Sequence, residues 1–165
     1  PQLFGGGQER GLRSGTVPTH QVAGMGAAYR IAGAGMAAES GRIATLRDAL
    51  WDGLARLPGG WRNGSAEHCV PGILSVSIDD VEGESLLFAL PGLAVASGSA
   101  CATTNAEPSY VLRALGRSER LAQSSLRLSL GRFTSDQDVA YAMHRIREEV
   151  QRLRAVAPVV ADGES

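Results

Sequence analysis

Residues 72–79 read GILSVSID, and this stretch decides the fold. Its apolar side chains alternate with serines, which predicts a β-strand with one buried side and one solvent-facing side. Residues 126–130, LRLSL, alternate in the same way and predict a second strand of this kind. A short run at residues 93–96 predicts a further strand. We therefore expect a half-buried sheet at the centre of the chain.

Helical patterns surround these strands. Between residues 19 and 57, apolar residues recur at three- and four-residue intervals, which predicts one or two long amphipathic helices with a bend near residues 33–35. A short helix is predicted at residues 82–90. Another is predicted at residues 108–115, because a proline suits the first helical turn and a glycine suits the position just past the end.

The last helix is expected to begin with a capping box formed by Thr134 and Gln137 and to run to about Val156. The order helix, strand, helix, strand, loop, helix, strand, helix is that of a compact α/β unit. We expect three parts: a glycine-rich segment at residues 1–18, the α/β domain with its long helix at residues 19–156, and a tail at residues 157–165.

The composition excludes several classes of protein. Of the 165 residues, 44% are hydrophobic and 20% are charged, as in an ordinary globular domain. A net charge of -1 provides no general field for nucleic acid or an anionic membrane. No apolar run approaches the roughly 18 residues that span a bilayer, and no export signal is evident. We expect a soluble, cytoplasmic protein. Because the first methionine is Met25, we also expect that translation starts upstream of Pro1 or that the product was trimmed.

The two cysteines are Cys69 and Cys101. Without an export signal, both are expected to be reduced. Cys101 ends the small-residue run SGSAC, and residues 102–106 also bury little, so we expect an exposed, movable loop that presents a reactive thiol. A free cysteine is more often a small buried apolar residue, and this alternative stays open on the pattern alone. The pair His68 and Cys69 lacks the spacing of a zinc site, so no metal site is predicted.

Three stretches carry a family resemblance: SGSACATTNAEPSYVLRAL at residues 97–115, GGGQERGLRSGT at residues 5–16 and SSLRLSLGRF at residues 124–133. Together they resemble the cysteine desulfurases of the long-loop class, class V aminotransferases that supply iron–sulfur cluster assembly. The resemblance covers nearly the whole chain and implies the C-terminal portion of such an enzyme. The implied fold is the small α/β domain of a fold-type I, aspartate aminotransferase-like enzyme. Residues 1–18 would then be the end of its large cofactor-binding domain.

The resemblance implies roles for three residues. Cys101 matches the nucleophile that takes sulfur from L-cysteine, which leaves L-alanine and a protein persulfide, and the same thiol could contact an iron–sulfur cluster transiently. Arg127 matches the arginine that binds the substrate α-carboxylate through two parallel donors, although its pattern alone favours a solvated outward residue. Thr16 matches a residue whose hydroxyl binds the cofactor phosphate of the other subunit, which implies a homodimer. Gln8 departs from the family, because many relatives carry histidine there.

The chain contains no lysine, since all 16 of its Lys+Arg residues are arginine. Pyridoxal phosphate, the cofactor that the resemblance implies, is held by a lysine imine, so we expect this chain alone to be inactive. The implied partners are L-cysteine, a second subunit, and a sulfur-acceptor or iron–sulfur scaffold protein, with no nucleic acid and no membrane. Two other interpretations remain open. The chain could be a non-enzymatic persulfide carrier or interaction module, or one half of a split enzyme.

Overall fold

The computed structural model describes residues 1–97 and 108–156. The chain divides into two compact units, Pro1–Ala38 and Glu39–Ser165. Helix α1 (Thr19–Leu54) begins in the first unit and ends in the second. Each unit is described by itself below.

The glycine-rich segment at the start of the first unit folds back on itself. Leu3 and Arg13 form a parallel β-bridge, and the short 3-10 helix η1 (Gln8–Gly11) lies between them in the sequence. Glu9 and Arg10 in this turn have φ angles of 52° and 57°, in the left-handed region that non-glycine residues seldom adopt. The segment is therefore a shaped loop, as its composition predicted.

The first half of α1 is helical but has no buried face within its unit. None of residues 19–38 is buried, and Met25, Tyr29 and Met36 are 57%, 75% and 65% exposed. The periodicity predicted the helix correctly. The packing partner that an amphipathic helix needs is not supplied by the first unit, so this half leaves a row of apolar side chains uncovered.

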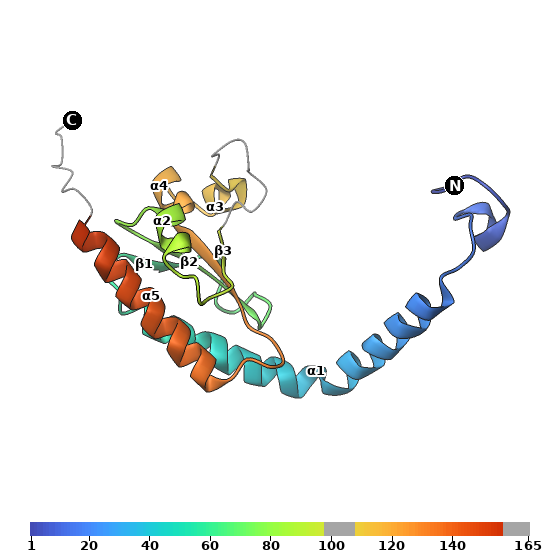
Figure 1. Ribbon diagram of the computed structural model, residues 1–165, viewed down its shortest axis with the longest axis horizontal. Helices are drawn as coiled ribbons and strands as arrows, with labels where there is room; N and C mark the ends of the chain where they lie inside the picture. Colours follow the sequence, from blue (N-terminus) through green and yellow to red (C-terminus); the bar gives the residue numbers. More distant parts are fainter. Residues whose placement is uncertain (98–107, 157–165) are drawn as a thin grey trace. The chain divides into compact units, whose positions relative to one another are not determined.

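A four-stranded antiparallel sheet forms the centre of the second unit (Figure 1). Its strands are β1 (Gly60–Arg62), β2 (Ile73–Ile78), β3 (Ala96–Ser97) and β4 (Ser125–Ser129). The order across the sheet is β1-β2-β4-β3. The two strands with alternating sequence are the central ones, and Val76 lies opposite Leu126 in their register. Antiparallel partners point to the same face, so the apolar side chains of both strands are on one side of the sheet.

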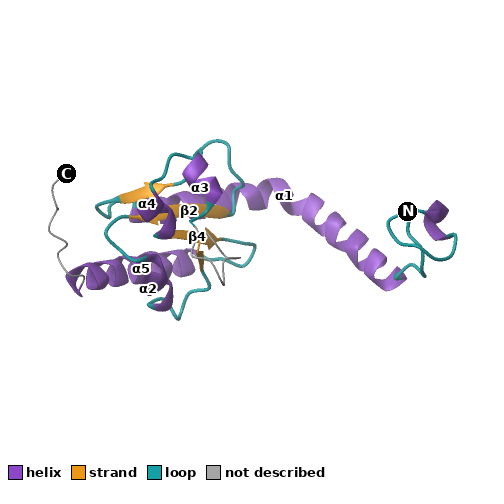
Figure 2. Cartoon of the chain, turned by 90° about the horizontal axis from the view of Figure 1, so that it is seen from above, coloured by secondary structure: helices purple, strands orange, loops and turns teal. Residues whose placement is uncertain are grey.

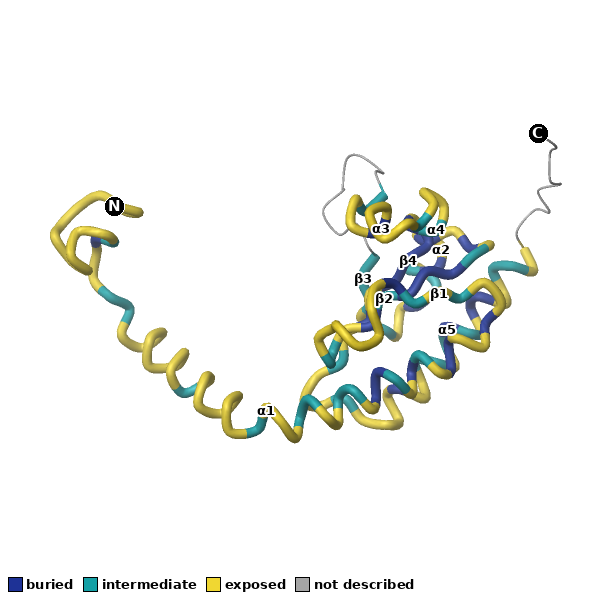
Figure 3. Tube along the Cα trace, turned by 180° about the vertical axis from the view of Figure 1, so that it is seen from behind, coloured by how far each residue is buried: buried dark blue, intermediate teal, exposed yellow. Residues whose placement is uncertain are grey.

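That apolar side is covered by the second half of α1 and by α5 (Asp136–Val156), which lie side by side beneath the sheet (Figure 1). Leu50 of α1, Leu126 of β4 and Ile146 of α5 are at most 3% exposed and belong to one hydrophobic cluster. In Figure 3 the buried positions of this unit gather on the sheet and on the facing sides of the two helices. Burial on this face supplies most of the driving force for folding of the unit.

Three short helices complete the unit: α2 (Gly83–Phe88), α3 (Tyr110–Ala114) and α4 (Glu119–Gln123). Helix α2 packs against α5, β3 and β4, and α4 packs against β2. Seen from above, α3 and α4 lie over β2 (Figure 2), on the side of the sheet opposite α5. The sheet therefore has helices on both faces.

An arginine ties α1 to the loop between β4 and α5. The Arg42 guanidinium donates to the carbonyls of Thr134 and Arg132 at 2.7 Å each and to that of Gly131 at 3.2 Å. Arg132 in turn forms an ion pair with Glu39. These bonds fix the end of β4 relative to the helix that covers it.

The helix start predicted at Thr134 and Gln137 is wrong by one residue. The capping box of α5 is formed by Ser135 and Asp138: the Asp138 carboxylate accepts from the Ser135 backbone N–H at 2.9 Å, and the Ser135 hydroxyl accepts from the Asp138 N–H at 3.2 Å. Thr134 instead accepts from the Gly131 N–H at 2.9 Å, which closes the preceding turn. A strand was expected at residues 93–96, but of these residues only Ala96 belongs to β3 and pairs with β4.

Candidate functional site

Arg127 lies in the middle of β4 and points to the face of the sheet opposite the core. Its neighbours Leu126 and Leu128 are buried at 1% and 4% exposure, whereas Arg127 is exposed. It lies opposite Ser75 of β2 on one side and Ala96 of β3 on the other. Both flanking side chains are small, so the guanidinium is uncovered. Within the described residues it has no hydrogen-bond or ion-pair partner, which leaves both of its parallel donors available to a carboxylate.

A chain of buried polar side chains runs beside this position on the same face. The Asn63 amide donates to the hydroxyls of Ser75 and Ser77 at 3.2 and 2.9 Å. The Ser77 and Ser125 hydroxyls are 2.6 Å apart, and Ser125 donates to the Leu121 carbonyl at 2.8 Å. Ser77 and Ser125 are 0% and 1% exposed, so these hydroxyls need partners inside the protein and have them.

Arg117 holds the connection between α3 and α4 on the sheet. Its Nε donates to the Asn63 side-chain oxygen at 2.8 Å and its Nη2 to the Arg62 carbonyl at 2.7 Å. The guanidinium also lies over the Trp61 ring, 5.5 Å from its centroid. The sequence does not predict a role for Arg117, because a single arginine in a loop gives no signal and its partners are 54 and 55 residues away.

The predicted nucleophile, Cys101, lies outside the described residues. The described chain stops at Ser97, the last residue of β3, and resumes at residue 108, just before α3. The strand that leads into this segment therefore pairs with Arg127 through Ala96. The helix that follows the segment connects to the loop held by Arg117.

Thr16 lies in the first unit, and Arg127 lies in the second. Thr16 is exposed, and its carbonyl accepts from Arg13 Nη1 at 3.4 Å. The same Arg13 nitrogen donates to the carbonyls of Ser14 and Gly15. Gln8, at the position that departs from the family pattern, accepts from the Gly15 N–H at 3.2 Å and so helps to shape this loop.

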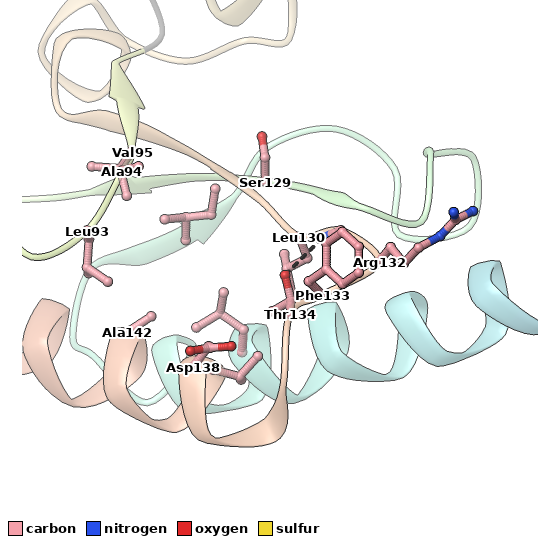
Figure 4. A pocket seen from close by; sticks show the side chains of 14 residues that line it. Leu93, Ala94, Val95, Ser129, Leu130, Arg132, Phe133, Thr134, Asp138 and Ala142 are labelled. Atoms are coloured by element: carbon pink, nitrogen blue, oxygen red, sulfur yellow. Dashed lines mark hydrogen bonds between the residues drawn. The ribbon is translucent and has the colours of Figure 1, made fainter. Parts of the chain in front are cut away.

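An apolar cavity of about 490 Å³ opens between the β3 edge of the sheet and the start of α5. It is lined by residues 93–95 before β3, residues 128–134 at the end of β4, and Val139 and Ala142 of α5 (Figure 4). Arg132 points away from it. Arg127 is not among the residues that line the cavity, so the two are separate features.

Two kinds of feature are absent from the described residues. No helix there is long and apolar enough to cross a membrane. No group of three or more His, Cys, Asp or Glu side chains in the same part of the chain could hold a metal ion.

The sequence matches the family named Aminotransferase class-V over residues 5–141. The chain belongs to this family. It is 55% identical over 158 residues to the cysteine desulfurase IscS of Serratia proteamaculans (strain 568), and 54% identical to that of Aeromonas salmonicida (strain A449). Each alignment covers 96% of this chain and 39% of the relative. The chain thus spans about two fifths of the length of the curated relatives that it matches.

Solved structures agree with the fold. The chain resembles a NifS-like protein with a TM-score of 0.80 and 32% identity, over 93% of this chain and 39% of that one. SspA, solved in complex with cysteine, matches with a TM-score of 0.57 and 26% identity over 82% of this chain and 36% of that one. The predicted α/β fold, as part of a fold-type I enzyme, and the predicted family are confirmed. The roles of Cys101, Arg127 and Thr16 stay predictions.

Proposed function

We propose that this chain is the C-terminal part of a cysteine desulfurase. The overall reaction would convert L-cysteine and the Cys101 thiol into L-alanine and a Cys101 persulfide. The atoms and electrons of this reaction balance without an added oxidant. The observation that carries the proposal is the 55% identity to a cysteine desulfurase over 96% of the chain. The cysteine-bearing structure of SspA supports the same substrate class.

Arg127 is the group in this chain that would bind the substrate. It presents an uncovered guanidinium between Ser75 and Ala96, and a planar guanidinium can bind a carboxylate through two parallel hydrogen bonds. β3, which pairs with Arg127, continues into the segment that carries Cys101. In the proposal, Arg127 orients the amino acid and Cys101 receives its sulfur.

Enzymes of this family use pyridoxal phosphate, and the residues of this chain do not form a complete site for it. The sequence has no lysine to form the imine. At the phosphate end, Thr16 offers an exposed hydroxyl, but the neighbouring Gly15 N–H already donates to Gln8. We therefore propose that the lysine-bearing part of the enzyme supplies the cofactor site, with Thr16 contributing to the phosphate site of a second subunit in a homodimer. The persulfide would pass to an acceptor or iron–sulfur scaffold protein.

The test uses the intact protein that contains this chain, incubated with ³⁵S-labelled L-cysteine. Replacement of Cys101 by serine should abolish label bound to the protein under non-reducing conditions and should reduce alanine release to background. Cys69→Ser is the matched control, because it removes the other thiol of this chain, and it should keep both signals. Label retained by Cys101→Ser and lost by Cys69→Ser would contradict the assignment.

The two alternative functions give different results in a second experiment. The isolated chain, incubated with a separate desulfurase and L-cysteine, should remain unlabelled if it acts only as part of an intact enzyme. Labelling of Cys101 under these conditions would favour a persulfide carrier. Co-purification of the chain with a separate lysine-bearing polypeptide, with activity restored in the complex, would favour a split enzyme.

A further inference from the structure

Cys69, which the proposed reaction does not use, lies against two arginine side chains. It is exposed and follows β1 in the loop that leads to β2. Arg47 Nη1 donates to its sulfur at 3.1 Å, and Arg62 Nη2 donates to it at 3.6 Å. The two guanidinium groups come from different elements, since Arg47 belongs to α1 and Arg62 ends β1. The fold, and not sequence proximity, therefore brings these three side chains together.

The charges of Arg47, Arg62 and their carboxylate partner do not balance. The side chains of Arg47 and Arg62 are 8% and 13% exposed, so both positive charges are largely removed from water. Asp48 is their only carboxylate partner within the described residues, at 2.9 Å from Arg47 and 3.5 Å from Arg62. Two cations and one anion leave one positive charge, and buried charges are stable only when they are paired. A carboxylate on a group attached to Cys69 would supply the second negative charge.

The pKa of Arg47 shows that this side chain remains one of the two positive charges. The hydrogen bond that Arg47 donates to Asp48 is the main cause that holds the pKa of Arg47 above its ordinary value, and the contact with Cys69 acts in the same direction. Burial opposes the shift but does not reverse it. Arg47 is therefore a fixed positive charge aimed at the sulfur.

We propose that Cys69, Arg47 and Arg62 form a thiol modification site that reacts with small disulfides carrying carboxylates. In this step the Cys69 thiolate attacks one sulfur of the disulfide, the bond between the two disulfide sulfurs breaks, and the other half leaves as a thiolate. Cys69 is oxidised to a mixed disulfide and the leaving half is reduced. A carboxylate on the attached half can then lie beside the two arginines and balance their charge. The preference of Cys69 for disulfides that carry carboxylates does not depend on the proposed desulfurase activity.

The experiment uses the intact protein with Cys101 replaced by serine, at neutral pH. Oxidised glutathione is the carboxylate-bearing probe and cystamine, which carries ammonium groups, is the opposite probe. Mass spectrometry of the peptide that contains Cys69 follows its modification separately from that of other cysteines. We expect faster modification by oxidised glutathione than by cystamine, and we expect raised salt to reduce the difference because charge steering is screened.

Three variants separate an electrostatic role from a structural one. Arg62→Gln should slow the reaction with oxidised glutathione about tenfold, because it removes one of the two cations that attract the carboxylates of the probe. Asp48→Asn should make it faster, because it leaves more positive charge beside the sulfur. Arg113→Gln removes an exposed arginine of α3 and should change nothing. Equal rates with the two probes, or a slowing by Asp48→Asn as large as that by Arg62→Gln, would overturn the proposal.

Discussion

Ala96 and Arg127 lie directly opposite each other in the antiparallel register of β3 and β4. Their side chains share one face of the sheet, so the small methyl group of Ala96 leaves space beside the guanidinium. Ser75 borders the other side of Arg127. This arrangement makes Arg127 the most direct test of the proposed substrate site.

Replacement of Arg127 by alanine should raise the KM for L-cysteine in the intact enzyme by about 10- to 100-fold, because a bidentate, charge-assisted contact would be lost. Arg127→Lys should restore only part of this loss, because an ammonium group cannot present two parallel donors. Stability should change little, since the side chain is exposed. Steady-state kinetics measures the effect, and Arg113→Ala is the control. An unchanged KM in Arg127→Ala would remove Arg127 from the substrate site.

Arg117→Ala should lower the free energy of unfolding by about 2 kcal/mol, because it removes two hydrogen bonds from a charged group and a contact with an aromatic ring. Arg113→Ala, from the exposed side of α3, should change it by less than about 0.5 kcal/mol. Urea denaturation of the two variants measures the difference. Equal effects of the two substitutions would mean that Arg117 does not anchor the loop.

Gly83→Ala should destabilise the protein by about 2 kcal/mol or more. A Cβ at Gly83 would come 2.1 Å from the Gln123 carbonyl oxygen, and this atom belongs to the backbone and cannot rotate away. Gly41 is a matched control within α1, because a Cβ there would meet nothing within 4 Å. Gly41→Ala should stabilise its helix by about 0.5–1 kcal/mol. The midpoint temperature of thermal unfolding should therefore fall for Gly83→Ala and rise for Gly41→Ala.

Glu82 should make stability fall in acid. Burial of its carboxylate opposes ionisation, but hydrogen bonds from Ser85 and Glu84 outweigh it and hold the pKa below its ordinary value. The carboxylate accepts from the Glu84 N–H at 3.0 Å and from the Ser85 N–H at 2.6 Å, which caps α2. The pKa of Glu82 is therefore lower in the folded state than in the unfolded state, where it is about 4.3. The ionised carboxylate stabilises the fold at pH values above about 4.3, and this stabilisation is lost as the pH falls through the folded-state pKa.

Glu82→Gln should therefore be less stable than the parent at neutral pH and should lose less stability on acidification. Urea denaturation at several pH values between neutral and strongly acidic conditions tests this. Parallel pH profiles for the two proteins would show that the cap does not depend on the charge.

The central strands and the long helices were predictable from the sequence, because one residue pattern sets each of them. Leu126 and Leu128 alternate with polar residues and lie on the core side of β4, as predicted. β1 was missed because its three residues have no alternation, and it becomes a strand only by pairing with β2. α4 was missed for a similar reason, since it is a short helix whose position depends on contact with β2.

The candidate site was less predictable than the fold. The pattern of β4 placed Arg127 on the outer face of the sheet, but it could not show that Ala96 and Ser75 leave it uncovered. The partners of Arg117 and of Cys69 come from distant parts of the sequence, and no local pattern signals them. The role of Cys101 rests on the family resemblance and lies outside the described residues.

The hydroxyl pair of Ser77 and Ser125 constrains how this protein can evolve. The two residues are partners in the register of β2 and β4, and both are almost fully buried. Loss of the Ser77 hydroxyl leaves Ser125 with the Leu121 carbonyl, and loss of the Ser125 hydroxyl leaves Ser77 with Asn63. Either substitution alone removes the 2.6 Å contact between the two hydroxyls, and a second substitution cannot remove it again. Positions 77 and 125 are thus coupled, because the second change at this pair costs less stability than the first.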